Sequence, residues 1–324
     1  MTPMRARQQL ASLGLPGGDA HDLPSSPLRF PDDGQYRVEI PSVEGPAAFE
    51  TVLHQAAHRE IRVHRISQGS GIQLLTEEEI QRMVTLGASN DVEVSLFTGP
   101  RGSFDVGVQA TTASGRVVAG ALRGADQLAY GVEDVLHACD LGVRGVLVAD
   151  LGQLMVLGRL KQTGDLPADL SLKVSVQLPV ANPATARVLE DLGATTLNLP
   201  VDLPLAAIAA IRQAVDLPLD IYVEAADDFG GTVRHYEVPE LVRVAAPVFL
   251  KFTARNAPNT YPAGQHLDRM VRDLAAERVR RACIGMALLR RYYPEAVPSR
   301  QGDYPLPSRS TRAGAVAAAD PHRG

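Results

Sequence analysis

Lysine is rare in this chain and falls at positions that suit chemistry. Lys161, Lys173 and Lys251 are the only lysines among 32 basic residues. Lys173 lies in LSLKVSVQLPV (170–180), where it shares a polar face with Gln177, while the alternate residues are apolar. A buried lysine loses its proton readily, which suits general-base or Schiff-base work. The plainer interpretation is a fixed cation that pairs with Glu224 or holds a substrate carboxylate.

Other strand-like segments show the same division between a polar and an apolar face. Asn198 alternates with leucines, Tyr222 and Glu224 alternate with Ile and Val, and Lys251 lies between Leu and Phe. In a strand, alternate side chains point to opposite faces. We therefore expect one shared polar interior. Its predicted members are Glu39, His64, Asp150, Lys173, Gln177, Asn198, Glu224 and Lys251, with Gln68 in the same parity as His64.

The elements that must position these residues alternate between strand and helix patterns. Thr76 with Glu79 forms a capping-box signature at the start of one helix. Eight strand–helix units within one chain match the period of a (β/α)8 barrel. An open doubly wound sheet is the main rival, but no GxGxxG follows the first strand. The predicted strands cover residues 37–43, 61–67, 92–99, 143–150, 172–178, 195–201, 217–225 and 247–254.

A barrel explains where the polar faces go. Alternate side chains of each strand point inward, and the others pack beneath the helices. Active sites of such barrels lie at the carboxyl ends of the strands. Because buried unpaired charges are costly, we expect the charged interior to serve chemistry or ligand binding. Internal salt bridges that brace the barrel are the structural alternative.

We predict an α/β fold, a single-domain (β/α)8 TIM barrel with flexible tails. Residues 1–34 are rich in Gly, Pro, Ser and Asp and are expected to form a flexible arm. Residues 35–297 form the predicted catalytic barrel. Residues 298–324 are expected to be a disordered tail.

Loops after the strands add candidate substrate-binding residues. The Gly-rich DDFGGTVRHY (227–236) follows the seventh predicted strand, and ARNAPNTYP (254–262) follows the eighth. Phosphate sites in barrels often use these two loops. Arg101, in TGPRG, is a candidate anion clamp. The predicted substrate-binding residues are Gln68, Arg101, Gln177, Asn198, Tyr222, Arg234, His235, Arg255 and Asn256.

A divalent metal is an open alternative. Glu39, Asp150 and Glu224, with a histidine from His64 or His235, are hard ligands that suit Mg, Mn or Zn. No close-spaced motif such as HExxH accompanies them, so the metal and any other cofactor stay unknown. The two cysteines are expected to be reduced, and the sequence has no GxSxG elbow.

Composition limits the classes of partner. Hydrophobic residues make up 45 % and charged residues 21 %, with a net charge of −5. This balance argues against nucleic-acid and membrane-surface binding. No apolar run approaches the roughly 18 residues of a membrane span. We expect a cytoplasmic protein with a small-molecule substrate, and we leave a homo-oligomer open.

Two segments stand out by their sequence pattern, RGVLVADLG (144–152) and the SVQ…N…LGAT stretch (175–195). Both resemble peptidase family U32, and the likeness extends over about residues 36–290. The resemblance implies a (β/α)8 barrel and a distant relationship to peptidases. PVFLKFTARNAP (247–258) lacks the cysteine-containing signature of the family. The resemblance therefore transfers no catalytic residue.

The predicted site and the resemblance together suggest three alternative functions. The first is a U32-peptidase-like hydrolase acting by acid–base chemistry on a small polar, anionic substrate. The second is a Schiff-base aldolase, lyase or isomerase acting on a sugar- or keto-acid-like substrate through Lys173 or Lys251. The third is a non-catalytic binding barrel. In the first, the predicted catalytic residues are Glu39, His64, Asp150, Lys173, Glu224 and Lys251, with His235 as the alternative proton shuttle.

Overall fold

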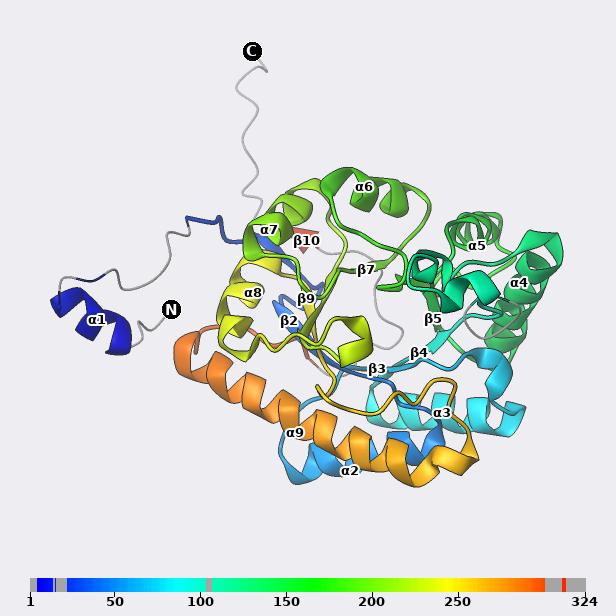
Figure 1. The fold of residues 1–324 in the computed structure, drawn as a ribbon, viewed down its shortest axis with the longest axis horizontal. Coiled ribbons are helices and arrows are strands. Elements are labelled where there is room, and N and C mark those ends of the chain that lie inside the picture. Colours follow the sequence, from blue (N-terminus) through cyan, green and yellow to red (C-terminus); the bar gives the residue numbers. More distant parts are fainter. Residues whose placement is uncertain (1–4, 14, 16–21, 103–106, 301–310, 313–324) are drawn as a thin grey trace, which may run out of the picture.

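Eight parallel strands close into a barrel in this computed structural model, which describes residues 5–13, 15, 22–102, 107–300 and 311–312 (Figure 1). The strands pair in chain order, and the last closes on the first. This arrangement confirms the predicted (β/α)8 TIM barrel. The barrel strands are β2 (Tyr36–Pro41), β3 (Arg65–Gln68), β4 (Glu93–Phe97), β5 (Gly145–Val148), β6 (Ser171–Val174), β7 (Thr196–Asn198), β8 (Leu219–Glu224) and β9 (Val248–Phe252).

Helices surround the barrel, and the longest, α9, packs along α2 (Figure 1). The predicted capping box at Thr76 and Glu79 is present at the start of α3. The helix α1 (Arg5–Ser12) has no buried residue. The helices around the barrel are α2 (Pro46–His58), α3 (Glu77–Asn90), α4 (Gly124–Asp140), α5 (Leu151–Thr163), α6 (Pro183–Asp191), α7 (Leu205–Ala214), α8 (Val238–Ala245) and α9 (Asp268–Tyr292).

The two faces of the strands separate apolar from polar residues, as the alternation predicts. Val38 and Ile40 of β2 and Leu250 of β9 belong to the apolar layer shared with the helices. Glu39, which lies between Val38 and Ile40, and Lys251, which follows Leu250, are paired in the β2–β9 register and buried inside the barrel. Burial of the apolar faces against helices supplies the main driving force for closing the sheet.

The facing predicted for His64 and Gln68 in β3, and for Glu224 in β8, is wrong. In β3, Arg65 and Ser67 point into the barrel, and Ile66 packs under the helices. His64 and Gln68 therefore do not belong to the inward set. In β8, the register shifts between Tyr222 and Glu224. An extra residue reverses the facing of the side chains that follow it. Glu224 accordingly pairs in register with Phe252 and faces α9.

Residues 26–34 and residues 298–300 cover the lower end of the barrel, where the strands begin. Phe30 is buried edge-on against Phe249, with ring centroids 5.4 Å apart. Ser299 is fully buried and accepts a 2.7 Å hydrogen bond from Arg37 Nε. The prediction of a flexible arm over residues 1–34 therefore does not hold for residues 26–34. Likewise, residues 298–300 belong to the folded domain. The short pair β1 (Leu28–Arg29) and β10 (Thr311–Arg312) lies outside the barrel.

None of the helices in the described ranges combines the length and apolar character needed to cross a lipid bilayer.

Candidate active site

A pocket of about 450 Å³ opens at the carboxyl ends of the barrel strands. Its floor and walls come from strand ends and from the loops that follow them. The insertion between β4 and α4, with the short helices η2 (Val108–Thr111) and η3 (Arg116–Val118), contributes to one side. The loop after β8, with η4 (Asp227–Phe229), contributes to another. The location matches the face at which (β/α)8 barrels hold their active sites.

Cations predominate among the charged residues of this mouth pocket. Lys251, Arg101 and Arg116 line it, and Asp228 is the acidic residue among the described lining residues. Arg101 stacks on the ring of Phe97 at 3.7 Å. Burial lowers the pKa of Arg101 to about 10, so its guanidinium stays charged near neutral pH. The pocket therefore favours an anionic ligand.

Lys251 brings its ammonium to the pocket floor. Its Nζ lies 4.3 Å from the centre of the Tyr222 ring and 3.5 Å from Glu39 Oε1. In the amide orientation that satisfies both neighbours, the side-chain oxygen of Asn198 accepts a 2.8 Å hydrogen bond from Lys251. Burial raises the pKa of Tyr222, so its hydroxyl stays protonated. The floor therefore presents a cation beside a neutral phenol.

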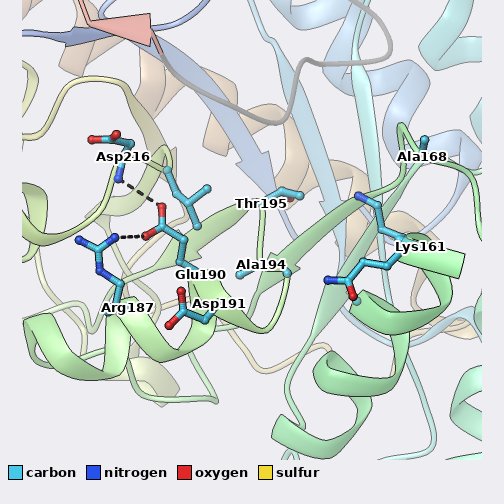
Figure 2. A pocket seen from close by; sticks show the side chains of 12 residues that line it. Lys161, Ala168, Arg187, Glu190, Asp191, Ala194, Thr195 and Asp216 are labelled. Carbon is cyan, nitrogen blue, oxygen red and sulfur yellow. Dashed lines mark hydrogen bonds and ion pairs between the residues drawn. The ribbon is translucent and has the colours of Figure 1, made fainter.

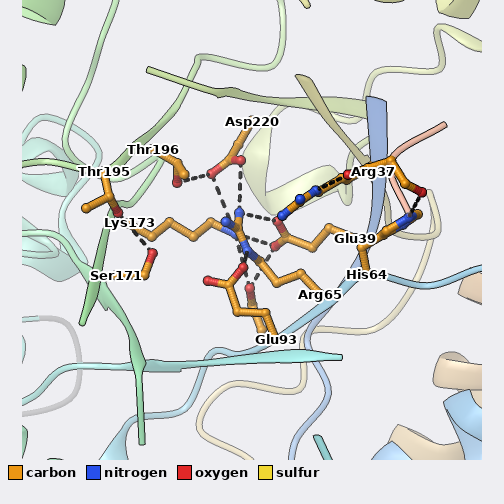
Figure 3. Close-up of polar contacts among 12 residues, drawn as sticks. Arg37, Glu39, His64, Arg65, Glu93, Ser171, Lys173, Thr195, Thr196 and Asp220 are labelled. Atoms are coloured by element: carbon orange, nitrogen blue, oxygen red, sulfur yellow. Dashed lines mark hydrogen bonds and ion pairs between the residues drawn. The ribbon is translucent and has the colours of Figure 1, made fainter. Parts of the chain in front are cut away.

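A compact ionic cluster lies in the barrel interior below this floor (Figure 3). Arg65 contacts three carboxylates: Glu93 at 2.7 Å, Asp220 at 3.0 Å and Glu39 at 3.3 Å. Lys173 donates to Glu39, and its Nζ is 3.7 Å from Asp220. With Lys251 included, three cations face three carboxylates. This balance lets so many charges remain buried.

The cluster shifts the pKa values of its members. Burial alone would raise the pKa of Glu39, but Lys173, Lys251 and Arg65 outweigh it and hold that pKa well below its usual range. Burial lowers the pKa of Lys173 to about 8, and the nearby Lys251 ammonium acts in the same direction. Glu39 is therefore a permanent carboxylate, whereas Lys173 can lose its proton near neutral pH.

Ser67 connects the cluster to the pocket. It lines the pocket, donates a 2.7 Å hydrogen bond to Glu39 Oε1 and accepts one of 3.1 Å from Lys173 Nζ. Its position in β3, beside β2, places the hydroxyl directly above Glu39. A polar path thus runs from the pocket surface to a buried lysine.

A second wall of the pocket depends on α9. Arg278, buried in that helix, donates a 2.7 Å hydrogen bond to the carbonyl of Ser42. The Ser42 hydroxyl is hydrogen-bonded to the hydroxyl of Tyr261, and both residues line the pocket. Burial raises the pKa of Tyr261. The tyrosine therefore contributes a neutral hydroxyl rather than a phenolate.

Several residues predicted from the sequence meet at this pocket. Gln68 lines it, although its amide group is bonded to the backbone of Gly71. Glu39 and Lys173 lie directly beneath the floor. The other predicted residues that line the pocket are Arg101, Gln177, Asn198, Tyr222 and Lys251.

His64 and Asp150 lie elsewhere. His64 accepts from Val38 N through Nδ1 and contacts the Ser299 carbonyl through Nε2, at the lower end of the barrel. Burial lowers its pKa to about 3. Asp150 caps α5 by accepting from Gln153 N at 2.8 Å. Both positions are structural, and we leave both residues out of the proposed site.

The predicted residues around the β8 loop form contacts outside the pocket. Glu224 bonds to His235 Nε2 at 3.0 Å, on the α9 side of the strand. Arg234 pairs with Glu237 at 2.6 Å. The last two predicted residues, Arg255 and Asn256, are both bound to Asp227.

The predicted metal ligands are separated. Glu39 is inside the barrel, Asp150 caps a helix and Glu224 faces α9. In the ranges that the structure describes, no group of three or more His, Cys, Asp or Glu side chains is arranged to hold a metal ion.

Sequence reasoning missed several residues of the site, among them Glu93 of the interior cluster and Arg116 of the pocket lining. Arg65, Ser67 and Asp220 belong to the interior, and Asp228 lies at the rim of the pocket. The alternation Arg-Ile-Ser around Ile66 is the signal that could have placed Arg65 and Ser67 inside. The partial desolvation of Asp228 raises the pKa of its carboxyl, and nothing in the sequence indicates this.

A larger cavity of about 790 Å³ lies at the opposite face, among α5, α6 and the loops that enter the strands (Figure 2). The two cations that line it are engaged: Arg187 pairs with Glu190 at 3.0 Å, and Lys161 donates to the Leu170 carbonyl. Because this cavity lies away from the carboxyl ends of the strands, we treat the mouth pocket as the candidate active site.

Comparison with known sequences agrees with the resemblance noted above. Residues 112–227 match the sequence model of Peptidase family U32. The chain resembles this family. The matched segment runs from the β4–α4 insertion through β8 and includes Lys173, Asn198, Asp220 and Tyr222. The closed barrel and the family match together support a barrel enzyme. No curated protein sequence matches the chain.

The solved structures that are similar to this chain share little sequence identity with it. The U32 peptidase Mk0906 is 18 % identical over 73 % of this chain and 97 % of its own, with a TM-score of 0.39. A 3-hexulose-6-phosphate synthase is 15 % identical over 76 % and 99 %, with a TM-score of 0.41. Thiamine phosphate pyrophosphorylase from Pyrococcus furiosus is 12 % identical over 76 % and 98 %, with a TM-score of 0.41.

Proposed function

We propose that the mouth pocket is the active site of a hydrolase that cleaves a small substrate carrying an anionic group next to an amide or ester carbonyl. The proposal rests mainly on the position of the Lys251 ammonium at the floor of a pocket whose charged lining residues are mostly cations. The family name supports amide-bond cleavage as the reaction class.

The residues divide into two roles. Arg101 and Arg116 attract the anionic group of the substrate. Lys251 and the protonated hydroxyl of Tyr222 face the carbonyl oxygen, where negative charge develops during attack on the carbonyl carbon. Fixed donors in a desolvated site stabilise such charge strongly. Asp228, with its raised pKa, accepts a proton from the attacking water at the rim.

The matched substitutions Lys251→Met and Lys161→Met test this assignment. N-acyl amino acids and short acidic peptides are supplied as substrates, and release of amine is measured. We expect Lys251→Met to lower kcat/KM by about 100-fold or more, because a charge-stabilising donor is removed. Lys161→Met, on α5 and outside the pocket, should match the wild type. Equal activity of Lys251→Met, or no turnover of anionic amides or esters by the wild type, would contradict the proposal.

A Schiff-base lyase is the second candidate, favoured by one observation. Of the three lysines, Lys251 is the one that lines the pocket, and it is only 1 % exposed. Borohydride reduction in the presence of keto acids should trap a covalent adduct on Lys251 if this candidate is correct. An unmodified Lys251 after reduction, with amide hydrolysis intact, favours the hydrolase.

A further inference from the structure

Ser67, Lys173 and Glu39 form a connected set at the floor of the pocket. The Ser67 hydroxyl is 3.1 Å from Lys173 Nζ and 2.7 Å from Glu39 Oε1. Lys173 also donates to the same Glu39 oxygen. Of these three residues, Ser67 lines the pocket, whereas the lysine and the glutamate are fully buried beneath it.

We propose that Ser67 is the catalytic nucleophile and Lys173 its general base, with Glu39 as the positioning residue for both. The inference rests on the hydrolase proposed above and makes its mechanism covalent. A hydroxyl within hydrogen-bond reach of a base, with the base oriented by a third group, is the arrangement that activates a serine. Serine–lysine pairs perform this task on unrelated folds.

The surroundings of Lys173 suit a base. The charged groups that face it are Glu39 from β2, Arg65 from β3, Asp220 from β8 and Lys251 from β9. Burial and the two neighbouring cations favour the neutral amine, while the carboxylates oppose them, and the pKa falls to about 8. A useful fraction of Lys173 is therefore neutral near physiological pH.

The proposed reaction has two stages. In the first, Ser67 Oγ forms a bond to the carbonyl carbon and passes its proton to neutral Lys173. The oxyanion forms beside the Lys251 ammonium, and its collapse breaks the carbon–nitrogen or carbon–oxygen bond. The leaving amine or alcohol takes the proton back from Lys173. In the second stage, water attacks the acyl-serine, releases the acid and restores the Ser67 hydroxyl.

Neighbouring serines lack the same set of contacts. Ser95 is the register partner of Ser67 in β4, but it is fully buried and does not line the pocket. Ser171, two residues before Lys173 in β6, is hydrogen-bonded to Thr195 at 2.9 Å. Ser42 lines the pocket, but its hydroxyl partner is Tyr261 rather than an amine.

A fluorophosphonate probe tests the dyad without knowledge of the natural substrate. Ser67 Oγ would form a bond to phosphorus, fluoride would leave, and Lys173 would take the hydroxyl proton. Intact-mass analysis of the full chain should show one adduct, and peptide mapping should place it on Ser67. Ser67→Ala should lose the adduct entirely, whereas the matched variant Ser95→Ala should be labelled at the wild-type rate.

The pH dependence of labelling separates a base from a merely structural lysine. The wild-type rate should rise about tenfold from pH 6 to pH 7 and level off above pH 8, as Lys173 loses its proton. Lys251→Met removes a neighbouring positive charge, so the midpoint should move upward by roughly half a unit to one unit. A rate that does not change with pH, or a midpoint that moves downward, overturns the role of Lys173.

Two outcomes distinguish this inference from the function on which it rests. A wild-type enzyme that hydrolyses anionic amides but is not labelled, or is labelled at another residue, overturns the dyad and leaves the hydrolase intact. Labelling of Ser67 without turnover of any anionic amide or ester supports the nucleophile and contradicts the proposed substrate class.

Discussion

The two ends of the barrel interior each hold a buried cation, but they differ in what surrounds it. At the lower end, Arg37 bonds to Ser299 and lies 4.2 Å from the centre of the Phe30 ring, under a cover made by residues 26–34 and 298–300. At the mouth, Lys251 lies beside a neutral amide and a phenol and borders an open pocket. Burial of charge is common to both ends, and at the mouth it is combined with space for a ligand.

The largest expected effect is on the free energy of unfolding, and it comes from the ionic cluster in the barrel interior between the two ends. Glu39→Gln should lower the free energy of unfolding by about 3–5 kcal/mol, because it leaves buried cations without their shared carboxylate. Glu93→Gln should cost less, since Glu93 contacts Arg65 alone among the cations of the cluster. Chemical denaturation of both variants measures the difference. Equal losses would show that Glu39 is not the centre of the cluster.

Phe30→Ala is the next test and addresses the lower end. Removal of a buried ring should lower the free energy of unfolding by about 3–4 kcal/mol. The affinity of the folded protein for an anionic pocket ligand should stay within twofold of the wild type, because the pocket lies at the other end. Calorimetric titration below the unfolding temperature checks this. A large loss of affinity would mean that the two ends are coupled.

Acid should act on the lower end through His64. Burial lowers the pKa of His64 to about 3. As pH falls, His64 is therefore protonated in the unfolded chain before it is protonated in the native state. Stability then falls as pH falls below about 6.5, by roughly 2 kcal/mol between pH 7.5 and pH 5. Urea unfolding at several pH values should show this slope, and His64→Asn should flatten it. A slope that persists in His64→Asn would assign it to another group.

The smallest effect on activity is expected at Glu224, the residue that faces α9. Glu224→Gln should keep the bond from Arg255 N and change kcat/KM by less than about twofold, since Glu224 touches no pocket residue through its carboxylate. Steady-state assays beside Lys251→Met measure the contrast. A loss comparable to that of Lys251→Met would return Glu224 to the active site.

The sequence predicts the barrel well because its strands alternate cleanly between polar and apolar residues. Lys173, Asn198, Tyr222 and Lys251 could be placed inside by this alternation. Two features interrupt it. The strand β3 is short, so counting from His64 gave the wrong parity, and the bulge in β8 reverses Glu224 after Tyr222. The bulge in β8 changes neither composition nor period enough to be recognised in one sequence, whereas the apolar Ile66, which shares its parity with His64, could have corrected β3.

The burial of residues 26–34 could not be predicted from the sequence, for a different reason. Residues 26–34 have no strand or helix periodicity, yet Ser26, Leu28 and Phe30 are buried. Their burial depends on a hole at the end of a closed sheet, which exists only after the strands have met. The pKa shift of Lys173 could not be predicted from the sequence either, because it depends on residues contributed by β2, β3, β8 and β9.

The equality of three cations and three carboxylates beneath the pocket also constrains how related chains can diverge. Loss of any one member strands an opposite charge in a place that water does not reach. Descendants of this barrel should therefore exchange such residues in oppositely charged couples, so that an aliphatic residue at position 173 is accompanied by a neutral one at 39 or 220.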